Sequence, residues 1–165
     1  MFGKQALVQR SQWHKRENVI AYLPKSQQEI FRKKLQKAYR HKSYKQVKQE
    51  LASIRKELNL LNQSAVNSLD EGLEETLTLH RLGMFEFLGI SLKTTNSLES
   101  LNSQFEQYNR RVSYWKNSSQ RQRCVSTALL EIEPNLRKIK GYRHLPLLRW
   151  AMERDDKKQI LADVA

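Results

Sequence analysis

The chain has 165 residues, of which 39% are hydrophobic, so it is long enough to bury the core of one domain of ordinary size. Thirty Lys and Arg against 17 Asp and Glu give a net charge of +13, which favours a polyanionic partner such as nucleic acid over a small-molecule substrate. A basic surface that serves only solubility is the alternative.

Cys124 is the single cysteine, which excludes an intrachain disulfide and favours a cytoplasmic location over a secreted one. No apolar run approaches the roughly 20 residues that a membrane span needs. The first residues, MFGKQALVQRSQWHKRENV, lack the apolar stretch and cleavage site of a signal peptide. The sequence therefore predicts a cytoplasmic protein with no membrane partner.

Residues 6–11 form the one predicted strand, because a short apolar run ends abruptly in polar and charged residues. A lone strand lacks partners for its backbone groups, so we expect the rest of its sheet to lie outside this chain. The pattern that follows is helical, and the predicted fold class is mainly α.

Two amphipathic helices are predicted next. Residues 27–41 carry apolar side chains at three- and four-residue steps and a basic opposite face, and residues 43–61 present a heptad-like apolar seam. The seam consists of Tyr44, Val47, Leu51, Ile54, Leu58 and Leu61. The short connection favours an intramolecular hairpin over residues 27–61, and coiled-coil dimerisation is the alternative.

A third helix is predicted over residues 64–82, and it carries an acidic cluster of four residues. These are Asp70, Glu71, Glu74 and Glu75. The segment GMFEFLGISLK then breaks the helical periodicity. Further helices are predicted to start near Asn96, to cover about residues 119–133 and to follow Pro146.

Charge is unevenly distributed along the chain. Residues 1–60 hold 15 basic and 4 acidic side chains, and residues 101–149 hold 10 and 3. Residues 61–100 between them hold 2 basic and 6 acidic side chains. An acidic middle flanked by basic blocks would suit a carboxylate site with walls that attract a phosphate backbone.

Six stretches together resemble the C-terminal part of the Mutator-type family of bacterial insertion-sequence transposases, from about Phe2 to Arg149. They are QRSQWHKRENV, YLPKS, EGLEETLTLHRLG, KTTNSLESLN, YWKNSSQRQR and GYRHLPLLR. The resemblance implies a ribonuclease-H-like DDE transposase core, in which a helical insertion separates the last strand from a helix bearing a glutamate. Residues 1–14 would then hold the last core strand, residues 15–89 the insertion, and residues 90–165 the C-terminal helices of an incomplete core.

The resemblance also makes Glu99 the catalytic and metal-binding glutamate. In DDE transposases two Mg²⁺ ions, held by clustered carboxylates, activate a water or a DNA 3′-hydroxyl for attack on phosphorus. The family's two aspartates precede the start of this chain, so we expect no catalysis by the chain alone. Without the resemblance, Asn96 and Glu99 fit a capping box. The acidic cluster of residues 70–75 matches no catalytic position of the family and fits better as a solvated face or as partners for the basic helices.

Two further sets of residues follow from the resemblance. The family commonly has Cys-x-x-His where this chain has Ser11 and His14, and serine is not an ordinary zinc ligand, so a metal role is doubtful there.

DNA contacts are expected from cations that surround two aromatic rings able to stack on an unpaired base, with core packing of the two rings as the alternative. The expected residues are Lys93, Arg110, Arg111, Tyr114, Trp115, Lys116, Arg121 and Arg123.

The sequence thus predicts the C-terminal part of a transposase, with DNA as its partner and full-length transposase or a second copy of the chain as further candidate partners. The leading alternative is a basic helical protein that binds DNA or transposase and regulates transposition without catalysis. A decayed gene product with no role is the third interpretation.

Overall fold

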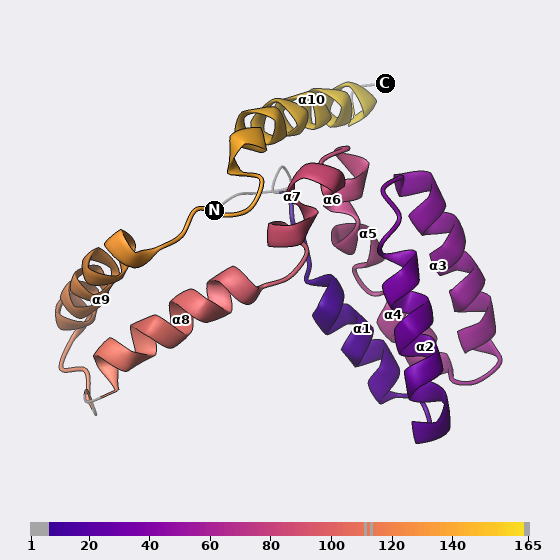
Figure 1. Cartoon of the computed structure of the whole chain (residues 1–165), viewed down its shortest axis with the longest axis horizontal. Coiled ribbons are helices and arrows are strands. Elements are labelled where there is room, and N and C mark those ends of the chain that lie inside the picture. Colours follow the sequence, from indigo (N-terminus) through magenta and orange to yellow (C-terminus); the bar gives the residue numbers. More distant parts are fainter. Residues whose placement is uncertain (1–6, 111, 113, 164–165) are drawn as a thin grey trace. The chain divides into compact units, whose positions relative to one another are not determined.

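The computed structural model describes residues 7–110, 112 and 114–163, with side chains described as far as residue 155. Every regular element within these residues is a helix, so the predicted mainly α class is confirmed (Figure 1). The chain divides into two compact units. Unit 1 contains residues 1–94 and 140–165, and unit 2 contains residues 95–139.

Unit 1 is built around four helices that pack on one another in sequence order. They are α1 (Gln12–Ala21), α2 (Lys25–Ala38), α3 (Tyr44–Asn59) and α4 (Gln63–Asp70). Shorter elements complete the unit: α5 (Leu73–Thr76), α6 (Thr78–Arg81), α7 (Phe85–Leu92) and the 3-10 turn η3 (Tyr142–His144), which leads into α10 (Leu145–Asp163). Helix α1 contacts α2 and α4, and α3 contacts the same two helices, so the four enclose a single core.

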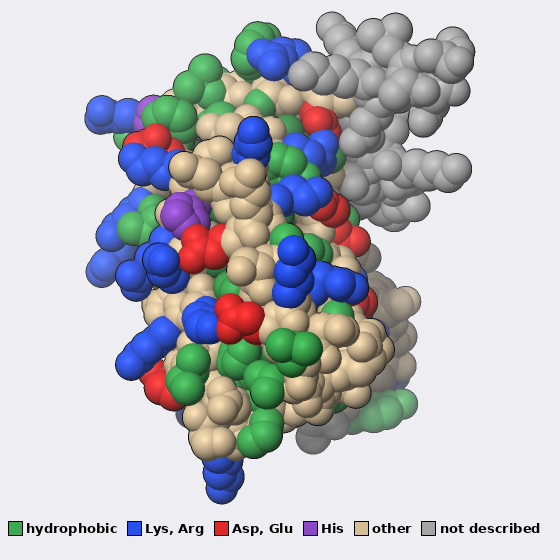
Figure 2. All heavy atoms as spheres, turned by 90° about the vertical axis from the view of Figure 1, so that its right-hand side faces the viewer, with side chains coloured by type: hydrophobic (Ala, Val, Ile, Leu, Met, Phe, Trp, Pro, Cys, Tyr) green, Lys and Arg blue, Asp and Glu red, His purple; other side chains and the backbone are tan. Residues whose placement is uncertain are grey.

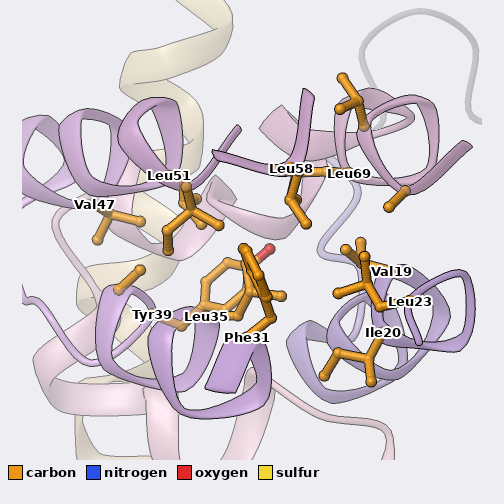
Figure 3. Packing of buried hydrophobic residues seen from close by; sticks show 14 of the residues in the cluster. Val19, Ile20, Leu23, Phe31, Leu35, Tyr39, Val47, Leu51, Leu58 and Leu69 are labelled. Atoms are coloured by element: carbon orange, nitrogen blue, oxygen red, sulfur yellow. The ribbon is translucent and has the colours of Figure 1, made fainter. Parts of the chain in front are cut away.

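The apolar faces of α2 and α3 meet in this core (Figure 3). Leu35 of α2 and Leu51 and Leu58 of α3 are at most 1% exposed. Burying a leucine fully contributes about 1.5–3 kcal/mol relative to exposure. Because Val47, Leu51, Ile54 and Leu58 of the heptad-like seam are buried within the chain, this part of the seam serves the hairpin with α2 rather than a coiled coil; Leu61, at the end of the seam, is 48% exposed.

The predicted strand is wrong over its described part, residues 7–11, because these residues adopt no regular structure; Ala6 lies outside the described residues. The amide of Arg10 donates a hydrogen bond to the carbonyl of Glu75 at 2.9 Å. The hydroxyl of Thr78 donates to the carbonyl of Val8 at 2.6 Å. Two backbone groups of the segment are therefore hydrogen-bonded to α5 and α6 and not to a neighbouring strand.

Helix α1 follows directly and was not predicted. Ser11 is its N-cap, and the Ser11 side chain accepts a hydrogen bond from the His14 amide at 3.4 Å. Serine is among the best N-cap residues, so a helix cap accounts for Ser11 without a metal. The inward face of α1 includes two buried polar residues, Gln12 and Lys15, beside Val19 and Ile20. This polar content hides the helical periodicity that an apolar stripe would show.

The predicted continuous helix over residues 64–82 is also wrong. It is divided into α4, α5 and α6, and the first break lies at Gly72, whose φ is +63°. A Cβ atom at Gly72 would lie 2.8 Å from the guanidinium carbon of Arg10. Glycine therefore permits both the left-handed backbone and the close approach of Arg10. The segment that breaks the periodicity, GMFEFLGISLK, contains helix α7.

Unit 2 is a helical pair at two of the predicted places. It consists of α8 (Asn96–Asn109) and α9 (Ser118–Ile132), which contact each other, and the 3-10 turn η2 (Glu133–Asn135). Helix α9 buries Ala128 and Ile132, whereas no residue of α8 is fully buried. In the described part of the chain, no helix combines the length and apolar character required to cross a membrane.

Candidate nucleic-acid interface and the Glu99 helix

The acidic cluster of residues 70–75 is engaged in ion pairs with basic residues of unit 1. Arg55 donates to both carboxylate oxygens of Asp70 at 2.7–2.9 Å. Lys48 pairs with Glu74 at 2.6 Å, and Arg10 binds both Glu71 and Glu75. Figure 2 shows acidic side chains lying among Lys and Arg on one face of the molecule. The structure thus supports the interpretation of this cluster as partners for the basic helices.

For two of these acids, Glu71 and Glu74, the contacts also shift the pKa in the direction that keeps the carboxylate charged. The hydrogen bond from Arg10 lowers the pKa of Glu71. Burial alone would raise the pKa of Glu74, but hydrogen bonds from Lys48 and Tyr44 outweigh burial and lower it.

Glu99 has a different setting, in the first turn of α8. Its side chain is exposed, and its carboxylate accepts a hydrogen bond from the Thr95 hydroxyl at 2.5 Å. The Glu99 amide donates to the Thr95 carbonyl at 2.9 Å. The N-cap of α8 is Thr95, one residue before the predicted cap at Asn96. Glu99 therefore takes part in starting the helix while its carboxylate faces solvent.

The acidic residues present do not by themselves fit a catalytic metal centre. Among the residues that the structure describes, no three His, Cys, Asp or Glu side chains come together where they could hold a metal ion. Divalent-metal catalysis of phosphoryl transfer requires several oxygen ligands in one place. Glu99 alone does not meet that requirement.

The predicted DNA-binding segment occupies the end of unit 2 where α8 leads into α9. Four of its cations are exposed, and none of these four forms an ion pair with a described residue: Arg110, Lys116, Arg121 and Arg123. Arg111 lies outside the described residues. Tyr114 is 76% exposed, so the core-packing alternative fails for this ring, whereas Trp115 is half-buried. The segment contains no acid between Glu106 and Glu131, so its positive charge is not offset locally.

Lys93, the remaining predicted DNA-binding residue, belongs to unit 1 and lies just after α7. Its carbonyl accepts a hydrogen bond from the amide of Gln12, the first residue of α1, at 2.9 Å. This contact places Lys93 in a pocket with Trp13 and Arg16 of α1 and with Arg40, which follows α2. Sequence reasoning missed the last three residues, because they are far from Lys93 in the chain and no motif links them.

His80 is the one buried histidine among the described residues, with 3% exposure. Its Nε2 donates a hydrogen bond to the His41 carbonyl at 3.1 Å, and its ring stacks on Phe85 with centroids 3.7 Å apart. Burial lowers the pKa of His80 to about 4. A neutral, enclosed ring of this kind belongs to the packing of unit 1. Cys124 is half-buried in unit 2 and is a free thiol.

Comparison with known proteins now identifies the family. The sequence pattern of "Transposase, Mutator family" matches residues 2–138, which is most of the 165-residue chain. The chain therefore belongs to the Mutator family of transposases, which confirms the resemblance. Transposition acts on DNA, so DNA is the general class of partner. No curated protein and no solved structure matches the chain.

Proposed function

We propose that this chain forms the glutamate-bearing part of a ribonuclease-H-like DDE transposase core, in which residues 15–89 are the helical insertion and Glu99 is the catalytic glutamate. The observation that carries the assignment is the position of Glu99. It is exposed in the first turn of α8, the first helix to follow the helices of residues 12–92. A carboxylate in that position is exposed and could hold a metal ion that contacts a substrate phosphate.

The chain's own acids do not complete two-metal chemistry, because the acidic cluster of residues 70–75 is taken up by ion pairs. We therefore assign Mg²⁺ to an active site in which further carboxylates join Glu99. The isolated chain is expected neither to cleave nor to join DNA.

DNA binding is assigned to the basic segment of unit 2, residues 110–123, which runs from the end of α8 into the first turns of α9. Its exposed cations are suited to phosphate contacts, and Tyr114 offers an aromatic face at the same end of unit 2. Contacts of this kind position a protein on DNA without reading its sequence.

A binding titration tests this assignment. Fluorescence anisotropy with a labelled generic duplex is measured over a range of salt for the wild type and for R110Q/R121Q/R123Q. Affinity should fall as salt rises, and the variant should bind more weakly, with a log–log slope shallower by about 0.9 per lost phosphate contact. The matched control K25Q/K45Q/K56Q removes three exposed unit 1 cations that form no ion pair within the described residues. Equal weakening by the two triple variants would contradict a localised interface.

A nicking assay tests the catalytic part of the proposal. Supercoiled plasmid is incubated with the chain and Mg²⁺ or Mn²⁺, with Glu99→Gln in parallel. We expect no metal-dependent nicking by either protein. Nicking by the wild type that E99Q abolishes would show that the chain holds a working metal site.

A second candidate function is regulation of transposition without catalysis. Two observations favour it. The clustered acids of residues 70–75 are bound in ion pairs, whereas residues 110–123 include exposed cations that form no ion pair with a described residue. Adding the chain to a strand-transfer reaction of a complete Mutator-family transposase would test it. Inhibition that is the same for wild type and E99Q would support regulation, and unchanged strand transfer would contradict it.

A further inference from the structure

The pocket that contains Lys93 is formed entirely within unit 1 and has an unusual charge balance. It encloses about 210 Å³ between α1, the end of α2 and the end of α7. Three of its lining residues are cationic and none is acidic. The lining consists of Gln12, Trp13, Arg16, Gln36, Tyr39, Arg40, Lys93 and Thr94.

Two of the three cations form no ion pair within the part of the chain that the structure describes. Arg16 donates to Glu17 at 2.8 Å, but neither Arg40 nor Lys93 forms an ion pair with any residue in the described ranges. Four other cations of α2 behave differently, because each of the four pairs with a glutamate, whereas Lys25 at the start of α2 has no such pair within the described residues. The four paired cations are Arg32, Lys33, Lys34 and Lys37. The pocket is thus a place where unit 1 leaves positive charge uncompensated, which favours an anionic ligand.

The floor of the pocket is held in place by hydrogen bonds. The buried side chain of Gln12 donates through Nε2 to the Thr76 carbonyl at 2.9 Å, and the Tyr39 hydroxyl lies 3.2 Å from the Thr76 hydroxyl. Burial raises the pKa of Tyr39 to about 12, so this phenol stays protonated. A preformed floor of this kind reduces the ordering that a ligand would otherwise require.

Trp13 adds an aromatic surface to the same pocket. It is 49% exposed although it lies on α1, whose inward face is buried. Its ring contacts the neighbouring His14 edge-on, with centroids 4.8 Å apart. An exposed indole beside uncompensated cations is the combination that binds single-stranded nucleic acid, because cations contact the backbone while an unpaired base stacks on the ring.

We propose that this pocket binds a single-stranded segment of nucleic acid, with a backbone phosphate on Arg40 and Lys93 and an adjacent unpaired base stacked on Trp13. The proposal deepens the DNA-binding function proposed above and rests on it. Single-stranded rather than duplex DNA is assigned because a paired base has both faces covered by its neighbours in the stack. The pocket is distinct from the basic segment of unit 2.

Tryptophan fluorescence tests the proposal on the full chain. In a W115F/W150F background Trp13 is the only tryptophan, since the chain contains three. Labelled oligothymidylate of about 12 nucleotides is titrated, so that anisotropy reports binding and Trp13 emission reports stacking. We expect Trp13 emission to be quenched in step with binding, and a duplex of the same length to leave it unchanged.

Charge variants in the same background separate the pocket from general electrostatics. R40Q/K93Q should weaken single-strand binding by about tenfold, reduce the quenching and lower the salt slope by about 0.7 per lost contact. K25Q/K56Q removes the same charge elsewhere on unit 1 and should retain the quenching. Circular dichroism checks that each variant is folded.

The outcomes distinguish this inference from the function on which it rests. Single-strand binding without quenching of Trp13, equal effects of the two double variants, or equal quenching by the duplex would overturn the pocket assignment and leave DNA binding by the basic segment intact. Failure of the wild-type chain, with all three tryptophans, to bind any DNA would overturn both.

Discussion

The buried ring of His80 predicts that unit 1 loses stability in mild acid. In the folded chain, the His80 Nε2–H donates to the His41 carbonyl, while Nδ1 is buried with no hydrogen-bond partner among the described residues. Protonation would place a charge on this enclosed ring. The pKa of His80 is accordingly lowered by burial, from an ordinary value of 6.5 to about 4.

The sign and size of the effect follow from proton linkage. Between pH 6.5 and pH 4 the unfolded chain binds a proton at His80 that the folded chain does not, so the free energy of unfolding falls as the pH falls. With these two pKa values, the His80 contribution to the fall from pH 7 to pH 5 is about 2 kcal/mol. That is a large part of the stability of an ordinary domain.

The assay is urea unfolding at pH 7 and pH 5 for the wild type and His80→Gln. Glutamine retains an N–H that can donate to the His41 carbonyl but does not titrate. We expect the wild type to lose about 2 kcal/mol more than H80Q between the two pH values. The acids whose pKa values are lowered are present in both proteins, so their contribution cancels in the difference. His14→Gln, a change at an exposed ring, measures the contribution of a surface histidine. Equal pH slopes for wild type and H80Q would refute the reasoning.

Three paired substitutions test the packing of unit 1, each read from the urea-unfolding free energy at pH 7. Leu51→Ala should lower the free energy of unfolding by about 3 kcal/mol, because the Leu51 side chain is 1% exposed. Its control, Leu60→Ala, changes a side chain that is 86% exposed and should cost under about 0.5 kcal/mol. Similar losses of stability for the two variants would contradict the burial of Leu51 in the core. Lys15→Met should cost about 1–3 kcal/mol of stability, because the buried Lys15 ammonium donates hydrogen bonds to the carbonyls of Ser68 and Glu71. Lys25→Met, at an exposed site, should be nearly neutral. A neutral K15M would show that the two hydrogen bonds add no stability. Gly83→Ala should cost about 1 kcal/mol of stability, because the Gly83 φ is +70° and no described atom lies near the new methyl group. Gly141→Ala should cost several times more, because a Cβ at Gly141 would lie 2.1 Å from the Phe87 carbonyl oxygen. The reverse order of the two losses would contradict the packing of η3 on α7.

The helices with continuous apolar stripes could be predicted from the sequence because local periodicity reports a buried face. Helices α2 and α3 lie where the three- and four-residue spacing of leucines and aromatics places them, as do α8 and α9 in outline. Family membership was also predictable, because long stretches of residues in order carry that information without any coordinates. The same stretches drew attention to Glu99, whose catalytic role stays a prediction.

Other features depend on contacts between distant parts of the chain. Helix α1 was not predicted because its buried face includes a charged residue, Lys15. The Lys15 ammonium donates hydrogen bonds to carbonyls at the end of α4, and no local sequence pattern indicates these contacts. The short apolar run predicts a strand over residues 6–11, but the described backbone of Val8 and Arg10 is hydrogen-bonded to Thr78 and Glu75 and not to a sheet. The pocket around Lys93 unites residues from α1, the end of α2 and the end of α7. The net charge can be added up from the sequence, but an ion pair forms only between side chains that the fold brings within about 4 Å of each other. Only the tertiary structure therefore decides which cations are paired with an acid and which are not.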